Sequence, residues 1–136
     1  MPSPVQLQIP PRPEYVGVIR LALGSLARSA GMDEESIDDL RIAISEACTN
    51  AVEAREQGPS DEPVTVTWDV DATTVVVEIS GRGEPSAARD VDTQGFSTRL
   101  AMSEALLKSL VDGYEITQAP EGGRVRLTLN LAGRRA

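Results

Sequence analysis

The sequence contains no histidine and only one cysteine, Cys48. The lack of histidine removes the commonest general base and the commonest metal ligand, so any base in this chain is expected to be a carboxylate. A single cysteine excludes an internal disulfide and a thiolate cage for a metal ion. Cys48 lies in an apolar-rich segment, which favours its interpretation as a small core residue.

Aromatic residues, basic residues and long apolar runs are also scarce. Aromatic residues make up 3% of the chain, so we expect an aliphatic core and no stacking surface for single-stranded nucleic acid. The net charge of −8 disfavours binding to a phosphate backbone and favours a basic protein partner. No segment approaches the roughly 20 apolar residues that span a bilayer, and the N-terminus does not resemble a signal peptide. We therefore expect a cytoplasmic protein that binds neither nucleic acid nor a membrane.

What remains is the composition of a globular protein. Hydrophobic residues make up 40% of the 136 residues, which predicts one domain over 1–136 with its own core. Alternating patterns predict strands at 5–9, 64–70, 73–79, 114–118 and 124–131. Helical periodicity predicts helices at 14–30, at 33–55 and from about 98 to 112.

The expected helix ends are marked by three residues. Pro13 suits a first helical turn, Gly31 suits a C-terminal cap, and Asp33 suits an N-terminal cap. Helices and strands are segregated along the chain, with two expected hairpins. This order predicts an α+β fold, a two-layer sandwich with helices on one face of a mostly antiparallel sheet.

The central helix carries two polar residues beside its apolar stripe. Glu46 and Asn50 are four residues apart, so they lie one turn from each other on the same face. A carboxylate and a carboxamide in this arrangement suit a hydrated divalent ion and a polarised nucleophile. The same spacing also fits the ordinary polar edge of an amphipathic helix. The apolar stripe itself is formed by Leu40, Ala43, Ile44, Ala47 and Ala51.

The segment 80–97 has no clear periodicity and is long for a loop inside a compact domain, which is typical of a functional or mobile loop. The helix expected after it would turn four leucines toward the core, namely Leu100, Leu106, Leu107 and Leu110.

Residues 13–20 (PEYVGVIR) and 39–52 (DLRIAISEACTNAV) resemble the anti-sigma-factor serine/threonine kinases of the RsbW/SpoIIAB type. This family belongs to the GHKL ATPase superfamily, which has the Bergerat nucleotide-binding fold. The segment 45–52 is the specific part, because it corresponds to the N box of the family. The expected order of helices and strands also matches along almost the whole chain.

The resemblance implies a role for several residues and partners. Glu46 would be the general base that activates the attacking hydroxyl, and Asn50 would ligate the Mg²⁺ that bridges the phosphates of ATP. The phosphoryl acceptor would be a serine of a STAS-type anti-sigma antagonist, and the second partner an alternative sigma factor that the protein sequesters. Arg20 matches an arginine that contacts partners, although it also fits an ordinary exposed helix residue. Members of the family form homodimers and regulate transcription, as in a stress response.

Two motifs of the family are altered here. The adenine-reading aspartate of its Asp-x-Gly motif is replaced by Gly81, whereas Gly83 is retained. Loss of such a charged hydrogen bond costs about 1.5–3 kcal/mol. The phosphate-binding Gly-x-Gly-Leu motif corresponds to 101–104 (AMSE), which has neither glycine. Ser97 and Thr98, at the expected helix start, offer an alternative anion-binding turn.

Three hypotheses follow from this pattern. The first is an active ATP- and Mg²⁺-dependent kinase that is also an anti-sigma factor. The second is a kinase-like regulatory binding protein without efficient nucleotide binding or catalysis. The third is a structural or adaptor domain with neither ligand. We favour an anti-sigma-type regulator and leave its catalytic activity open.

Overall fold

The computed structural model describes residues 4–57, 62–71, 73–80, 93–119 and 122–131, with side chains for all of these except 56–57, 93–100, 118–119 and 122. The elements in chain order are β1 (Val5–Ile9), the 3-10 turn η1 (Pro13–Tyr15), α1 (Val16–Ser29), α2 (Glu34–Gln57), β2 (Val64–Val70), β3 (Thr74–Ser80), α3 (Thr93–Leu110), β4 (Gly113–Ala119) and β5 (Gly122–Asn130).

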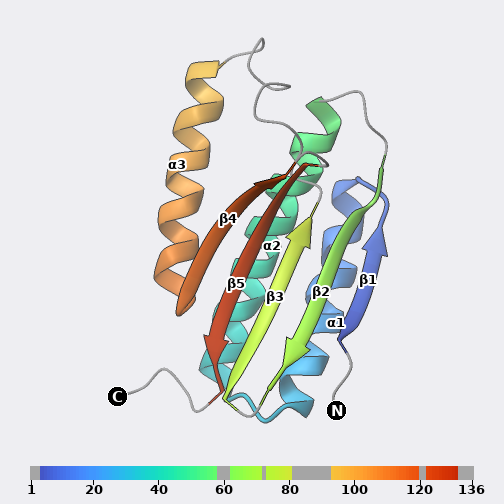
Figure 1. The fold of residues 1–136 in the computed structure, drawn as a ribbon, viewed down its shortest axis with the longest axis vertical. Coiled ribbons are helices and arrows are strands. Elements are labelled where there is room, and N and C mark those ends of the chain that lie inside the picture. The colour runs from blue at the N-terminus through green and yellow to red at the C-terminus, as the bar shows by residue number, and fades with distance from the viewer. Residues whose placement is uncertain (1–3, 58–61, 72, 81–92, 120–121, 132–136) are drawn as a thin grey trace.

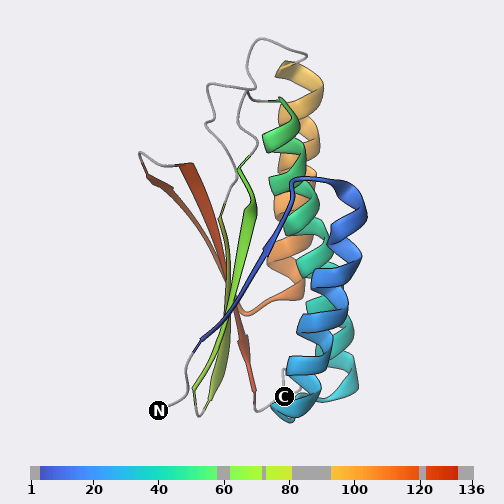
Figure 2. The ribbon, with the colours of Figure 1, turned by 90° about the vertical axis from the view of Figure 1, so that its right-hand side faces the viewer.

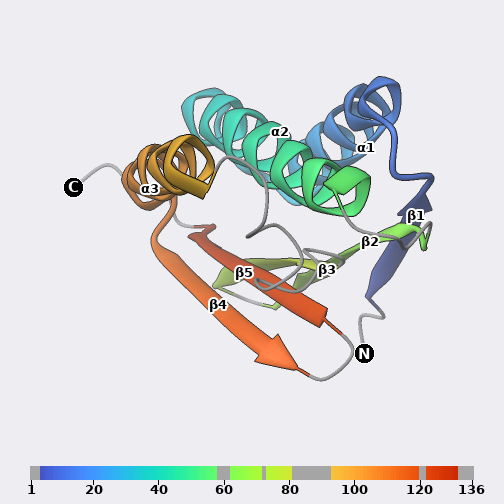
Figure 3. The same cartoon turned by 90° about the horizontal axis from the view of Figure 1, so that it is seen from above.

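The strands form one sheet in the order β1-β2-β3-β5-β4, in which every neighbouring pair is antiparallel (Figure 1). The helices lie side by side against one face of the sheet, and the opposite face is left open (Figures 2 and 3). The predicted two-layer α+β fold is therefore confirmed. Both predicted hairpins, β2–β3 and β4–β5, are confirmed as well.

The three residues that were predicted to mark helix ends are found at helix ends in the structure. Pro13 stands in the first turn of η1, and α1 ends just before Gly31, whose φ of +90° is a conformation that glycine adopts at little cost. The Asp33 carboxylate accepts a hydrogen bond of 2.8 Å from the backbone N–H of Ser36. Asp33 is therefore the N-cap of α2, which satisfies one of the backbone N–H groups that the first helical turn leaves unpaired.

The core lies between α2 and the sheet. All five residues of the predicted apolar stripe on α2 are buried, and they pack toward alternate residues of the central strands, such as Val66, Val77 and Leu127. Cys48 is also fully buried, as predicted, and burial raises the pKa of its thiol to about 12, because a thiolate is poorly solvated there.

Two predictions for the third helix were wrong. Helix α3 begins at Thr93 rather than near 98, because Gly95 is tolerated inside a helix at a cost of only about 1 kcal/mol. Leu106 was expected to face the core, but it is 40% exposed. The inward face is instead set by Ser103 and Leu107, which are four residues apart and both buried, whereas Leu106 lies on the flank. Leu110 is half-buried, and the side chain of Leu100 lies outside the described part.

Among the helices of the described residues, none combines the length and the apolar character that crossing a membrane requires.

Candidate functional site

Glu46 and Asn50 lie on the flank of α2 that faces α3, and both side chains are half-buried. Helices α2 and α3 run side by side, as both the front view and the view from above show (Figures 1 and 3). On the sheet side of the same turns, Ala47 and Ala51 are buried, so α2 approaches the sheet closely. The two polar residues are thus held on a rigid, well-packed element at the junction of two helices.

Asn50 is hydrogen-bonded to α3. Its Nδ2 atom donates to the Oγ atom of Ser103 across 2.8 Å, and the serine is only 5% exposed. The two residues are 53 positions apart in the chain, so this bond joins two elements that meet only in the folded protein. The amide nitrogen of the predicted metal ligand is therefore bonded to a residue of the segment that corresponds to the phosphate-binding motif, whereas the amide oxygen is not part of this bond.

Glu46 differs from Asn50 in this respect. Within the described part of the chain, its carboxylate forms neither a hydrogen bond nor an ion pair. A half-buried carboxylate without a partner is chemically suited to accept a proton from a hydroxyl group placed beside it. The structure thus leaves Glu46 available for the role that the resemblance implies.

The segment 101–104 forms a continuous part of α3. Its backbone N–H groups are directed at carbonyl groups four residues earlier, as in any α-helix. With alanine and serine in place of the two glycines, nothing interrupts the helix there. In this arrangement the segment does not fit a phosphate-binding loop, although Glu46 and Asn50 do suit a Mg²⁺–nucleotide complex chemically.

Among the described residues, no group of three or more carboxylate, thiol or imidazole side chains could hold a metal ion. A Mg²⁺ ion in this protein would therefore be held by few protein oxygens together with oxygens of its ligand and water, which is the usual arrangement for this ion.

Four other residues were predicted to bind nucleotide, and the structure describes only two of them. Ser97 and Thr98 do not stand at a helix start, because α3 begins at Thr93. Their N–H groups therefore lie within the helix, and the argument for an anion-binding turn no longer applies to them. Gly81 and Gly83 lie outside the described residues.

Arg20 is exposed on α1 and reaches toward α2. Its Nη1 atom donates a hydrogen bond of 3.3 Å to the Oγ atom of Ser45, the residue that precedes Glu46. Near this contact, a Cβ atom at Gly24 would lie 2.9 Å from the Nε atom of Arg41, so the absence of a side chain at Gly24 makes room for that arginine. The surface formed by α1 is thus linked directly to the helix that carries Glu46.

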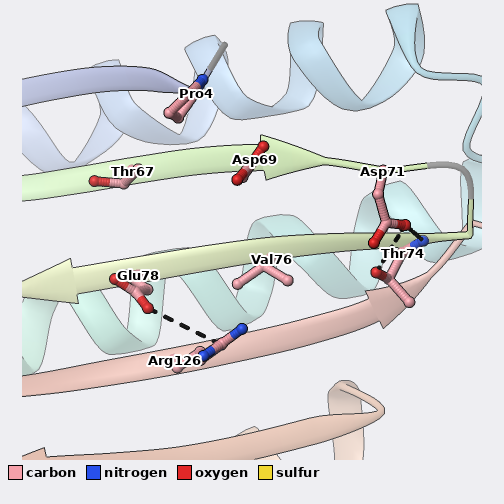
Figure 4. Close-up of a pocket in the computed structure, with 8 residues that line it drawn as sticks. All are labelled: Pro4, Thr67, Asp69, Asp71, Thr74, Val76, Glu78 and Arg126. Carbon is pink, nitrogen blue, oxygen red and sulfur yellow. Dashed lines mark hydrogen bonds and ion pairs between the residues drawn. The ribbon is translucent and has the colours of Figure 1, made fainter. Parts of the chain in front are cut away.

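The face of the sheet opposite the helices contains a polar groove of about 290 Å³ (Figure 4). In its floor, Glu78 and Arg126 approach to 4.0 Å. At one end, the Asp71 carboxylate accepts hydrogen bonds of 2.8 Å from the N–H groups of Thr73 and Thr74, and these bonds lower its pKa. The groove is lined by Pro4, Thr67, Asp69, Asp71, Thr74, Val76, Glu78 and Arg126.

Sequence reasoning missed Ser103 as the partner of Asn50. The available signal was its spacing from Leu107 and Leu110, since residues at i, i+4 and i+7 share one helix face. Sequence reasoning also missed the groove, because its lining comes from three strands and two flanking segments.

Comparison with known proteins gives a consistent result. A model of the histidine kinase-like ATPase domain matches residues 9–129. The serine-protein kinase RsbW of Bacillus pumilus is 34% identical over 136 aligned residues, which cover 91% of this chain and 83% of the relative. RsbW of Bacillus velezensis is 30% identical over 146 aligned residues, which cover 96% of this chain and 88% of the relative. For RsbW of Listeria innocua the identity is 40%, over 61% of this chain and 53% of the relative.

Among solved structures, the RsbU and RsbW domains of Rv1364c from Mycobacterium tuberculosis match with a TM-score of 0.73 and 21% identity. The match covers 96% of this chain and 33% of that chain. This likeness shows that the two share a fold.

Proposed function

Because the chain belongs to the histidine kinase-like ATPase family and is of the RsbW type, we propose that it is an anti-sigma factor that sequesters an alternative sigma factor in the cytoplasm. The observation that carries this proposal is the exposed surface of α1. Val18 and Leu21, three residues apart on one face of this helix, are 54% and 71% exposed, and Arg20 lies on the flank of the same helix that faces α2. Exposed apolar side chains that share a face are typical of protein-binding surfaces. The net charge of −8 suits a partner with a basic surface.

The test is co-purification of the chain with each alternative sigma factor of its source organism. We expect a stable complex with at least one of them on size exclusion and a loss of transcription directed by that factor. Failure of every sigma factor to form a complex would contradict sequestration.

A second candidate function is ATP-dependent phosphorylation of a serine in a STAS-type antagonist. It is supported by Glu46, which is half-buried, has no partner among the described residues and lies one turn from Asn50. Bound Mg²⁺–ATP would supply the phosphoryl group. Asn50 would hold the metal through its amide oxygen, and Glu46 would take the proton of the serine hydroxyl. Gly81 and Gly83 would border the adenine, with weaker recognition of its amino group than an aspartate provides.

Isothermal titration with Mg²⁺–ATP, Mg²⁺–ADP and Mg²⁺–GTP separates the two candidates. We expect binding of the adenine nucleotides and, in the presence of the antagonist, a phosphoserine detectable by mass spectrometry. If no heat of binding is measured at millimolar nucleotide, the kinase hypothesis is rejected. The regulatory role without nucleotide would then remain.

We also propose that the domain, residues 1–136, acts as a homodimer that pairs through the open face of the sheet. Asp69 and Asp71 lie at one end of that face, and Arg124 lies at the other, because β2 and β5 run parallel on either side of β3. Two copies could pair through this face around a two-fold axis that passes through the groove. The axis would place the end with Asp69 and Asp71 of one copy against the end with Arg124 of the other. Such a pairing would allow Arg124 of each copy to form an ion pair with Asp69 or Asp71 of the other.

A further inference from the structure

The contact between Asn50 and Ser103 joins the two elements that a nucleotide would have to separate. The distance of 2.8 Å between Nδ2 and Oγ leaves no room for a ligand between the two side chains. Ser103 is 5% exposed and Leu107, one turn further along α3, is 1% exposed, so this face of α3 is firmly packed. The hydrogen bond is therefore formed by a serine that is buried where α3 packs, and not by a mobile surface side chain.

In the docked helix, the backbone N–H groups of residues 101–104 are not free to bind a phosphate group. Residues 101–104 are helical, and their N–H groups are used inside α3. The bond to Ser103 uses Nδ2 of Asn50 and not Oδ1, the atom that would hold the metal. Phosphate groups are bound by free backbone N–H groups, so binding of a Mg²⁺–triphosphate by residues 101–104 requires that α3 unwind near Ser103, and this unwinding breaks the bond.

We propose that Ser103 is an affinity-determining residue, whose bond to Asn50 competes with nucleotide by holding α3 in its docked helical form. This inference rests on the proposed nucleotide site. The protein exists in a closed form, in which the bond between Asn50 and Ser103 is made, and in an open form that binds nucleotide. The apparent dissociation constant equals the intrinsic one divided by the fraction of open molecules. Loss of one hydrogen bond of ordinary strength raises that fraction about tenfold, provided that the closed form predominates.

The variants that test this are Ser103→Ala, which removes only the hydroxyl, and Ser103→Gly, which also weakens the helix at that point. The matched control is Ser109→Ala, because Ser109 is an exposed serine of the same helix whose hydroxyl bonds to the Leu106 carbonyl. Circular dichroism first establishes that each variant keeps its helix content. The probe is the Mg²⁺ complex of a non-hydrolysable ATP analogue, and the measured quantity is its dissociation constant by isothermal titration.

A second measurement needs no nucleotide. The side-chain NH₂ signals of Asn50 are followed in ¹H–¹⁵N spectra of the free proteins. We expect them to shift in Ser103→Ala and to stay in place in Ser109→Ala, because only the first variant removes the acceptor of Nδ2.

The proposal predicts about tenfold tighter binding for Ser103→Ala, at least as large a gain for Ser103→Gly, and no change for Ser109→Ala. Unchanged or weaker binding in Ser103→Ala, with a wild type that binds, would overturn the competition and leave the kinase function intact. If no variant binds at millimolar analogue, both the competition and the nucleotide site are rejected, even when the Asn50 signals shift. Asn50 signals that do not respond to Ser103→Ala reject the contact itself.

Discussion

Glu46 is the residue on which the proposed phosphoryl transfer depends. Replacing it with the isosteric Gln removes the negative charge and the proton acceptor, and it keeps the shape and one acceptor oxygen. We expect Glu46→Gln to bind Mg²⁺–ATP within about threefold of the wild type and to lose at least about a hundredfold in phosphoserine formation. Quantitative mass spectrometry of the antagonist measures the rate. Glu53→Gln, a change on the same flank of α2, serves as the control, and equal losses in the two variants would remove Glu46 from the role of base.

Arg20 is the residue at which the proposed sigma-factor surface is most easily tested. A buried interfacial arginine commonly contributes 2 kcal/mol or more to binding, which corresponds to at least about thirtyfold in affinity. We therefore expect Arg20→Glu to weaken sigma-factor binding by at least about thirtyfold in a titration by bio-layer interferometry. Arg12→Glu, at an exposed arginine just before the same helix region, should leave the affinity unchanged. Equal affinity of both variants would exclude Arg20 as a contact.

At the scale of elements, the β2–β3 connection contains a pH-sensitive turn. The Asp71 carboxylate is bonded to the N–H groups of Thr73 and Thr74, which holds its pKa below the usual range. A pKa that is lower in the folded state contributes stability above the unfolded-state pKa, and this contribution disappears as the pH falls through the folded-state value.

Asp71→Asn should therefore lower stability at neutral pH and reduce the loss of stability on acidification. Urea denaturation between pH 7 and pH 3 measures both effects. Asp69→Asn is the control, because the N–H groups of this turn bond to Asp71 and not to Asp69. If Asp71→Asn loses as much stability between pH 7 and pH 3 as the wild type does, the prediction is contradicted.

At the scale of the whole molecule, the open face of the sheet is the place to test assembly. Val76 is half-buried in the middle of the groove. A glutamate there would stand directly opposite Asp69 on β2, without a cation to pair with it at that position, so Val76→Glu should convert a dimer into a monomer in sedimentation-velocity experiments. Gln8→Glu is the control, since Gln8 is an exposed residue of the edge strand β1 outside the groove lining. Dimers in both variants would place the pairing surface elsewhere, for example at a sheet edge.

Local patterns in the sequence determined most of the architecture. The strand at Val64–Val70, the cap at Asp33, the end of α1 before Gly31 and the apolar stripe of α2 all follow from neighbouring residues, and each lies where it was predicted. Periodicity and capping act over one or two turns, so the sequence alone contains this information. The four-residue spacing likewise predicted that Glu46 and Asn50 share one helical face.

Only the tertiary structure decided what these side chains meet. The hydrogen bond from Asn50 to Ser103 spans 53 residues, and the inward turn of Ser103 in place of Leu106 depends on how α3 docks on α2. The periodicity of residues in α3 allows more than one face of the helix to turn inward. Packing against α2, which is distant in the sequence, decides which face does so. The sequence thus specified which residues share a helix face, and the contact between two helices decided that Asn50 is bonded to Ser103.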